Sequence, residues 1–113
     1  MRLAYSQYLP PVATLGDWAF LIGTLTLYMF CWEWFFRGFA LFGAAQGLGF
    51  IPAIAIQAAL FGLAHFGKPP VEMGSAFAGG LVLGILAWRE KSFFPAFLIH
   101  ALIHVSWAIL IFL

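Results

Sequence analysis

Four long apolar segments follow one another along this chain and limit what it can fold into. Short stretches rich in glycine, proline or charge separate them, and they cover residues 18–42, 48–66, 74–89 and 93–113. The hydrocarbon core of a bilayer is about 30 Å thick, which takes about 20 apolar residues in a helix. Because hydrocarbon offers no partner to a backbone N–H or C=O group, each segment is expected to be helical. The sequence therefore predicts an all-α, polytopic membrane helical bundle of about four transmembrane helices.

The composition supports a membrane protein and excludes several other classes. The chain is 65% hydrophobic and only 8% charged, with a mean hydropathy of +1.03, which is unlike a soluble globular domain. A net charge of +1 without any basic run excludes a nucleic-acid partner. The single cysteine, Cys31, allows neither a disulfide framework nor a thiolate metal cluster, and we expect it to be a small core residue.

The N-terminal stretch differs from the rest of the chain. Its apolar part is short and is broken by Pro10 and Pro11, unlike the uninterrupted apolar region of a secretory signal. Its two tyrosines suit the headgroup level of a membrane, where an aromatic body and a polar tip are both accommodated. We expect residues 1–17 to be an interfacial N-terminal arm and residues 18–113 to be the membrane-embedded core.

Local signals predict where the helices begin and end. Asp17 stands where the N-cap of the first helix would lie, and Gly43, Gly47 and Gly49 predict a turn after that helix. The second helix is expected to stop at residues 67–70, which contain two prolines. A strip of small residues in the third segment predicts close approach of another helix: Gly79, Gly80 and Gly84.

Five ionisable side chains lie within the apolar segments, namely Glu33, Arg37, His65, His100 and His104. A charged side chain at mid-bilayer costs roughly 2.5 to 3.5 kcal/mol on insertion scales, so each is a candidate for function. Glu33 and Arg37 are four residues apart, as are His100 and His104, so each pair shares a helix face. Counting about 1.5 Å per residue along the predicted helices places His65 deeper than Glu33 and the other histidines.

These residues allow structural as well as functional interpretations. Glu33 and Arg37 can neutralise each other as a buried ion pair, and a single histidine can hydrogen-bond a carbonyl group of a neighbouring helix. Taken together, however, an acid and three imidazoles are the ligands and the base of a hydrolytic metal site, in which the ion activates water and a carboxylate takes its proton. The set favours a buried polar site completed by several helices.

Three motifs, in order along the chain, resemble those of a known family. WEWFFRGF, FGLAH and HALIH are similar to the motifs of the CAAX-protease and bacteriocin-processing (CPBP) intramembrane proteases, also called the type II CAAX prenyl endopeptidase or abortive-infection family. The first motif of the family consists of two adjacent glutamates, three further residues and an arginine. Its arginine matches Arg37 and its second glutamate matches Glu33, whereas its first glutamate falls on Trp32.

The other two motifs match the histidines. A phenylalanine, three further residues and a histidine match Phe61 and His65, and a histidine, three residues and an asparagine match His100 and His104. Histidine in place of that asparagine keeps a metal ligand or donor at the position. Trp32, in contrast, replaces the glutamate to which water activation is usually assigned in the family.

The resemblance implies an intramembrane endopeptidase of the metalloprotease type. Glu33 would act as general base on water and Arg37 would orient it, so that Glu33, Arg37, His65 and His100 are the expected catalytic residues. His65, His100 and His104 would bind a divalent metal, with zinc as the expected ion, or would stabilise an oxyanion.

The resemblance also implies a location and partners. The protein would be an integral protein of a prokaryotic plasma membrane, and its substrate a membrane protein, a lipidated tail or a leader peptide. Members of the family usually have more membrane helices, so the chain would correspond to their core, as a fragment, a truncated product or a minimal form that completes its site as a homo-oligomer.

Two other functions stay open. A catalytically inactive relative, acting as a membrane scaffold or a bacteriocin-immunity protein, is favoured by Trp32. A small transporter would need a polar stripe that reaches both membrane faces, and the second segment offers only Gln57 as a further large polar side chain.

Overall fold

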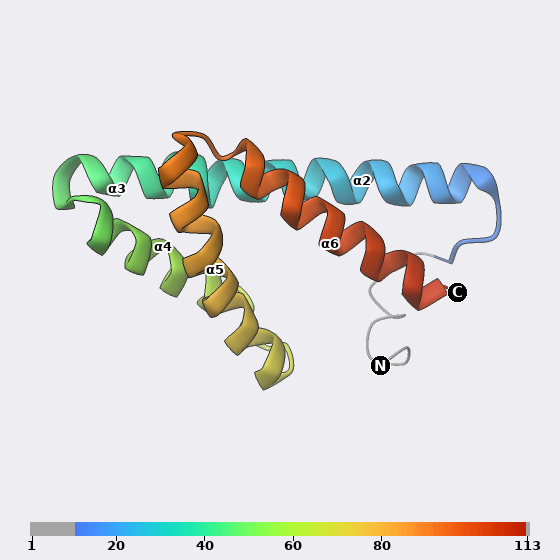
Figure 1. Cartoon of the computed structure of the whole chain (residues 1–113). Helices are drawn as coiled ribbons and strands as arrows, with labels where there is room; N and C mark the ends of the chain where they lie inside the picture. Colours follow the sequence, from blue (N-terminus) through green and yellow to red (C-terminus); the bar gives the residue numbers. More distant parts are fainter. Residues whose placement is uncertain (1–10, 113) are drawn as a thin grey trace.

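The computed structural model describes residues 11–112, and every regular element in that part of the chain is a helix (Figure 1). A continuous helical stretch is formed by α2 (Leu15–Glu33), the π-helical η1 (Trp34–Ala40) and α3 (Leu41–Leu48). The remaining helices are α4 (Phe50–Leu63), α5 (Pro70–Glu90) and α6 (Phe94–Phe112). The predicted all-α helical bundle is confirmed. Residues 1–10 of the predicted N-terminal arm lie outside the described residues.

Three of the helical stretches are long and apolar enough to cross a bilayer. They are Leu15–Leu48, Pro70–Glu90 and Phe94–Phe112. The fourth, α4, has 14 residues and so measures about 21 Å at 1.5 Å per residue, less than the roughly 30 Å of the hydrocarbon core. The predicted second segment is shorter than expected because residues 64–67 form a turn.

The first helix is longer than predicted because two of its glycines do not interrupt it. Gly43 and Gly47 lie within α3, and only Gly49 breaks the helix, with a φ of +83° that favours glycine. At the other end, Thr14 is the N-cap, and Asp17 is the third residue of the helix. The Asp17 N–H donates to Thr14 Oγ1 at 3.1 Å, and the Thr14 N–H donates to Asp17 Oδ2 at 2.8 Å, which completes a capping box.

Small residues allow α4 and α5 to pack closely. A Cβ atom added to Gly80 would lie 3.0 Å from the Ala58 Cα, and one added to Gly84 would collide with the Gln57 side-chain amide. Gln57 is buried, and its Nε2 donates across the interface to the Gly80 carbonyl at 2.7 Å. The prediction of a close helix approach is therefore confirmed for Gly80 and Gly84. Gly79 is not part of this interface, because nothing lies within 4 Å of an added Cβ.

Gly80→Ala is expected to lower the free energy of unfolding by about 1 to 3 kcal/mol, because the added methyl group would overlap the α4 backbone. Gly79→Ala is the matched control one residue away, where the methyl group meets no neighbour and alanine has the higher helix propensity. Unfolding in detergent micelles, followed by circular dichroism, would measure both. Equal stability of the two variants would contradict the close packing.

The helices form two pairs that diverge from the region of η1 (Figure 1). In one pair α6 lies along α2, where the rings of Phe30 and Phe97 are 5.3 Å apart and those of Trp18 and Phe112 are 5.7 Å apart. The other pair is α4 and α5. The bundle is thin, with extents of 48, 27 and 15 Å, so many large apolar side chains face outward, as suits a lipid environment. Cys31 is exposed as well, so the expectation of a buried cysteine was wrong.

Candidate active site

A buried ionic cluster lies where α2, η1 and α6 meet. Glu33 is the last residue of α2 and Arg37 lies in η1, and both are 0% exposed. Arg37 Nη1 donates to Glu33 Oε1 at 2.9 Å, and His100 Nδ1 from α6 lies 2.5 Å from the same oxygen. The structure thus joins three of the five predicted residues at one carboxylate oxygen.

The π-helical turn carries one member of this cluster. In η1 the backbone bonds run from i to i+5, a geometry that is rare and often found at functional sites. Arg37 and Phe36 are the buried residues of this turn. The Arg37 guanidinium also lies 4.0 Å from the centre of the Phe61 ring of α4, a cation–π contact that ties α4 to the cluster.

The cluster is not fully satisfied by hydrogen bonds. Glu33 Oε2 and the Nε and Nη2 atoms of Arg37 are buried, with no hydrogen-bond partner among the described residues. Buried polar groups are nearly always paired, and an exception calls for an explanation. Spare polar capacity inside an apolar protein is more typical of a functional site than of an ion pair kept for packing.

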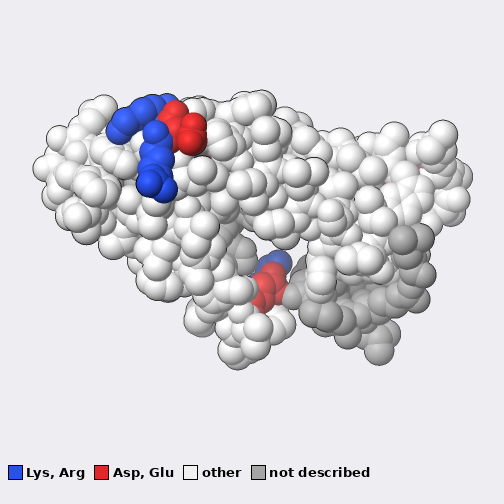
Figure 2. All heavy atoms as spheres, in the orientation of Figure 1, with Lys and Arg blue, Asp and Glu red and all other residues white. Residues whose placement is uncertain are grey.

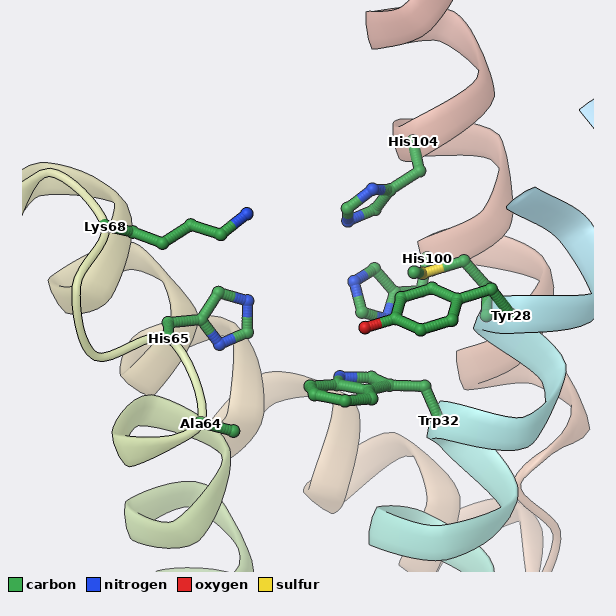
Figure 3. A pocket seen from close by; sticks show the side chains of 8 residues that line it. Tyr28, Trp32, Ala64, His65, Lys68, His100 and His104 are labelled. Carbon is green, nitrogen blue, oxygen red and sulfur yellow. The ribbon is translucent and has the colours of Figure 1, made fainter. Parts of the chain in front are cut away.

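A small pocket opens beside the cluster and has a volume of about 70 Å³ (Figure 3). Its lining comes from α2, from the turn after α4 and from α6, and consists of Tyr28, Met29, Trp32, Ala64, His65, Lys68, His100 and His104. Figure 3 shows His65 on one side and His100 with His104 on the other, while the Tyr28 hydroxyl and the Trp32 indole nitrogen point into the space between them. His100 therefore belongs to both the cluster and the pocket.

His65 reaches this pocket because α4 ends earlier than predicted. It lies in the turn after α4, and its Nδ1 is 2.8 Å from the Phe61 carbonyl oxygen. Its ring centroid is 6.2 Å from that of Trp32. The prediction from the sequence assumed that the second helix continues to residue 66, and for that reason it placed His65 deeper in the membrane than the other histidines. His104 lies one turn after His100, with ring centroids 4.7 Å apart.

Trp32 and Glu33 take different directions from the same helix. Successive residues of a helix are about 100° apart, so Trp32 faces the pocket while Glu33 faces α6. Trp32 is stacked against Tyr28, with ring centroids 5.5 Å apart, and also contacts Phe36. An aromatic wall thus stands where the family resemblance would put a carboxylate. Glu33 itself does not line the pocket. It contacts His100, which does.

The histidines do not fit a zinc site with three ligands in this arrangement. Among residues 11–112 no three side chains of the His, Cys, Asp and Glu types are grouped so that they could hold a metal ion. His65 and His100 each direct Nδ1 at an oxygen acceptor, as metal-bound histidines do, but no third ligand joins them. The Lys68 ammonium, which lines the same pocket, would also repel a cation. This arrangement therefore argues against the zinc site that the family resemblance implies.

Two polar residues of the pocket lining, Tyr28 and Lys68, were not identified from the sequence. Tyr28 lies four residues before Trp32, a spacing that puts both on one helix face and could have identified it. Lys68 was interpreted only as part of a helix stop. It is paired with Glu72 at 3.3 Å, and Figure 3 shows its side chain extending over the pocket toward His104.

Comparison with protein families identifies the family of this chain. The family described as type II CAAX prenyl endopeptidase Rce1-like matches residues 14–106. The chain belongs to this family. No curated protein and no solved structure matches the chain significantly. This type II CAAX prenyl endopeptidase relative is an integral membrane protein, and three helices within residues 11–112 are long and apolar enough to span a bilayer. The matched residues include every member of the cluster and of the pocket.

Proposed function

We propose that this family member is an intramembrane endopeptidase that hydrolyses a peptide bond of a membrane-associated substrate in the pocket beside His100. The observation that carries the proposal is the contact of 2.5 Å between the buried Glu33 Oε1 and His100 Nδ1. An ionised carboxylate can only accept a hydrogen bond, so Nδ1 carries the proton and Nε2 is left as a basic nitrogen. Hydrolases that hold a histidine with a carboxylate use the same arrangement.

The reaction follows from this arrangement. A water molecule in the pocket gives a proton to His100 Nε2 while its oxygen attacks the carbonyl carbon of the substrate. The imidazolium that forms is stabilised by Glu33. When the C–N bond breaks, the same proton passes to the leaving nitrogen, and the products are a carboxylic acid and an amine. His65 lies on the opposite wall of the pocket. Its Nδ1 is hydrogen-bonded to the Phe61 carbonyl oxygen, so its Nε2 is the nitrogen left to contact the water molecule.

The roles of Glu33 and Arg37 differ here from those expected from the sequence. Glu33 is fully buried and does not line the pocket, so it is proposed as a positioning residue that sets the tautomer of His100. Arg37 shares the same carboxylate oxygen and offsets its charge within the apolar bundle. The role of general base, which the sequence assigned to Glu33, is proposed here for His100. A prokaryotic plasma membrane, with a lipidated tail or a leader peptide as substrate, is the setting that the family resemblance supports.

Cleavage by reconstituted protein tests the proposed function. The full chain is placed in lipid vesicles with a membrane-anchored, fluorogenic peptide, and the release of product is compared with that of a His65→Ala/His100→Ala double variant. The wild type is expected to cleave and the double variant to be inactive at equal levels of inserted protein. Cleavage by neither protein, or by both equally, would favour an inactive relative that acts as a scaffold or an immunity protein, for which Trp32 is the supporting feature.

Zinc content is expected to be well below one equivalent in the purified wild type, because no third ligand joins His65 and His100. Mass spectrometry of detergent-purified protein would measure it, with a His100→Ala/His104→Ala variant as the matched control. Stoichiometric zinc in the wild type that disappears in the variant would show that the three histidines rearrange to bind a metal. In that case the ion, rather than His100, would activate the water.

A further inference from the structure

We propose that a second pocket, where α3 meets the end of α5, binds the phosphate group of an anionic membrane phospholipid. This α3–α5 pocket has a volume of about 250 Å³. Its lining consists of Phe42, Ala45, Gln46, Trp88 and Lys91. None of these residues lines the pocket beside His100 or belongs to the ionic cluster around Glu33. The inference is therefore independent of the proposed hydrolysis.

A stack of three aromatic rings supports one wall of the α3–α5 pocket. The Trp88 ring is stacked against Phe42 of α3, with centroids 5.8 Å apart, and against Phe50 of α4, with centroids 5.3 Å apart. These contacts fix the end of α5 beside the turn between α3 and α4. The Lys91 ammonium lies 3.8 Å from the centre of the Trp88 ring, and this cation–π contact holds a positive charge at the pocket.

Lys91 has a backbone conformation that favours glycine. It caps α5 with a φ of +54°, and it is the only residue other than glycine with a positive φ in the described part of the chain. Its N–H and that of Ser92 donate to the last carbonyl groups of α5, a role in which glycine is usual. Glycine would adopt this φ without strain on a Cβ atom. A strained residue of this kind indicates a role for its side chain.

The charges at this end of the molecule favour an anion. Arg89 and Lys91 contribute two positive charges and Glu90 contributes one negative charge. Figure 2 shows this charged patch at the upper left, with uncharged surface around it. No carboxylate of residues 11–112 lines the α3–α5 pocket. The Gln46 amide in the lining can donate hydrogen bonds to an oxygen, and lysine is a common ligand of phosphate.

The place of the pocket relative to the membrane identifies the source of the phosphate. Because α5 is long and apolar enough to cross a bilayer, its charged end is expected at the level of the lipid headgroups, where tryptophan is also enriched. Three exposed apolar side chains lie at the turn beside the pocket: Leu48, Phe50 and Ile51. Acyl chains can pack on this surface while the phosphate reaches Lys91, a contact that a free phosphate ion would lack.

The lipid that stays bound after extraction tests the inference. The full chain is reconstituted in vesicles of equal parts phosphatidylglycerol and phosphatidylcholine, extracted in a mild non-ionic detergent, and its retained lipids are measured by mass spectrometry. Phosphatidylglycerol is expected to be enriched about fivefold, the equivalent of the roughly 1 kcal/mol that one basic side chain contributes at an anionic membrane surface. Equal retention of the two lipids would overturn the inference. Release of the retained lipid by inorganic phosphate would do so too, since it would assign the pocket to the free ion.

Variants of Lys91 separate lipid binding from a purely structural role. Lys91→Gly suits the positive φ, so it is expected to unfold at the same or a higher temperature than the wild type and yet to lose the enrichment. Lys91→Gln is expected to lose it as well, whereas Lys91→Arg keeps the charge and the enrichment.

Lys68→Gln is the matched control, because it removes a lysine charge near the other end of α5, and it is expected to leave the enrichment unchanged. Retention of the enrichment in both Lys91→Gly and Lys91→Gln would refute the inference. An equal loss in Lys68→Gln would refute it as well, because the preference would then depend on overall charge rather than on the α3–α5 pocket.

Discussion

Replacing His100 with alanine is expected to lower the rate of peptide cleavage by about 10² to 10⁴-fold, the usual contribution of a general base. The imidazole is the group that faces the pocket and is held by Glu33 from behind. Its loss removes the imidazole through which Glu33 is proposed to act on water in the pocket. The measurement is kcat/KM for the membrane-anchored peptide in vesicles, where equal loss in kcat and in kcat/KM would indicate an interaction made in the transition state.

Two further variants separate the chemistry of His100 from its packing. His100→Gln can still donate an amide hydrogen to Glu33 but has no basic nitrogen, so it is expected to be stable and as inactive as His100→Ala. His104→Asn, one turn further along α6, restores the residue of the family motif and is expected to retain most of the activity. Cleavage at the wild-type rate by His100→Gln would refute the role of His100 as the base.

Arg37→Ala is expected to destabilise the folded protein by about 3 to 5 kcal/mol, because it leaves a buried carboxylate without its cation. Arg37 and Glu33 are both 0% exposed, with 2.9 Å between Nη1 and Oε1, so water cannot replace the lost partner. The variant also loses the contact with the Phe61 ring at 4.0 Å. Unfolding by sodium dodecyl sulfate from mild micelles, followed by circular dichroism, would measure the change.

A double variant tests whether the loss of stability in Arg37→Ala comes from the unpaired charge of Glu33 or from the lost side-chain volume. Glu33→Leu/Arg37→Leu is expected to recover most of the lost stability, since apolar replacement of a buried ion pair is often neutral or better, while peptide cleavage stays abolished. If the double variant is less stable than Arg37→Ala, the pair would be a net stabilising element, and its presence in the bundle would need no functional explanation.

The helical class and the motif residues could be predicted from the sequence because both depend on short-range physics. Uninterrupted apolar segments must be helical in hydrocarbon, and ionisable residues within them are costly enough to mark a site. The small-residue spacing of Gly80 and Gly84 likewise indicated the α4–α5 contact that the structure contains. Helix ends were less predictable. Glycines at 43 and 47 were compatible with either helix or turn, and in the structure the helix continues through both and ends at Gly49, which has a positive φ.

The site could be predicted as a set of residues but not as an arrangement. Glu33, Arg37 and the three histidines follow from the sequence, and the family match over residues 14–106 agrees with the motifs. Which atom of Glu33 meets which nitrogen of His100 could not be predicted, because the two residues lie on different helices and only their packing angle sets the contact. The same holds for Lys68, whose sequence neighbours give no sign of a pocket, whereas the spacing of Tyr28 and Trp32 could have placed Tyr28 on the same helix face as Trp32.

The sequence by itself thus determined that this protein is a helical membrane protein of the type II CAAX prenyl endopeptidase family, and it singled out the ionisable residues of the site, of which the structure buries Glu33, Arg37 and His100. Periodicity, hydropathy and motif spacing are properties of the chain read in order, so they need no knowledge of its packing. Only the tertiary structure decided that Trp32 faces the pocket, that Glu33 lies behind His100, and that the turn after α4 brings His65 opposite. Those relations depend on how α2, α4 and α6 are rotated about their axes and inclined to one another, which is fixed by contacts between residues distant in sequence.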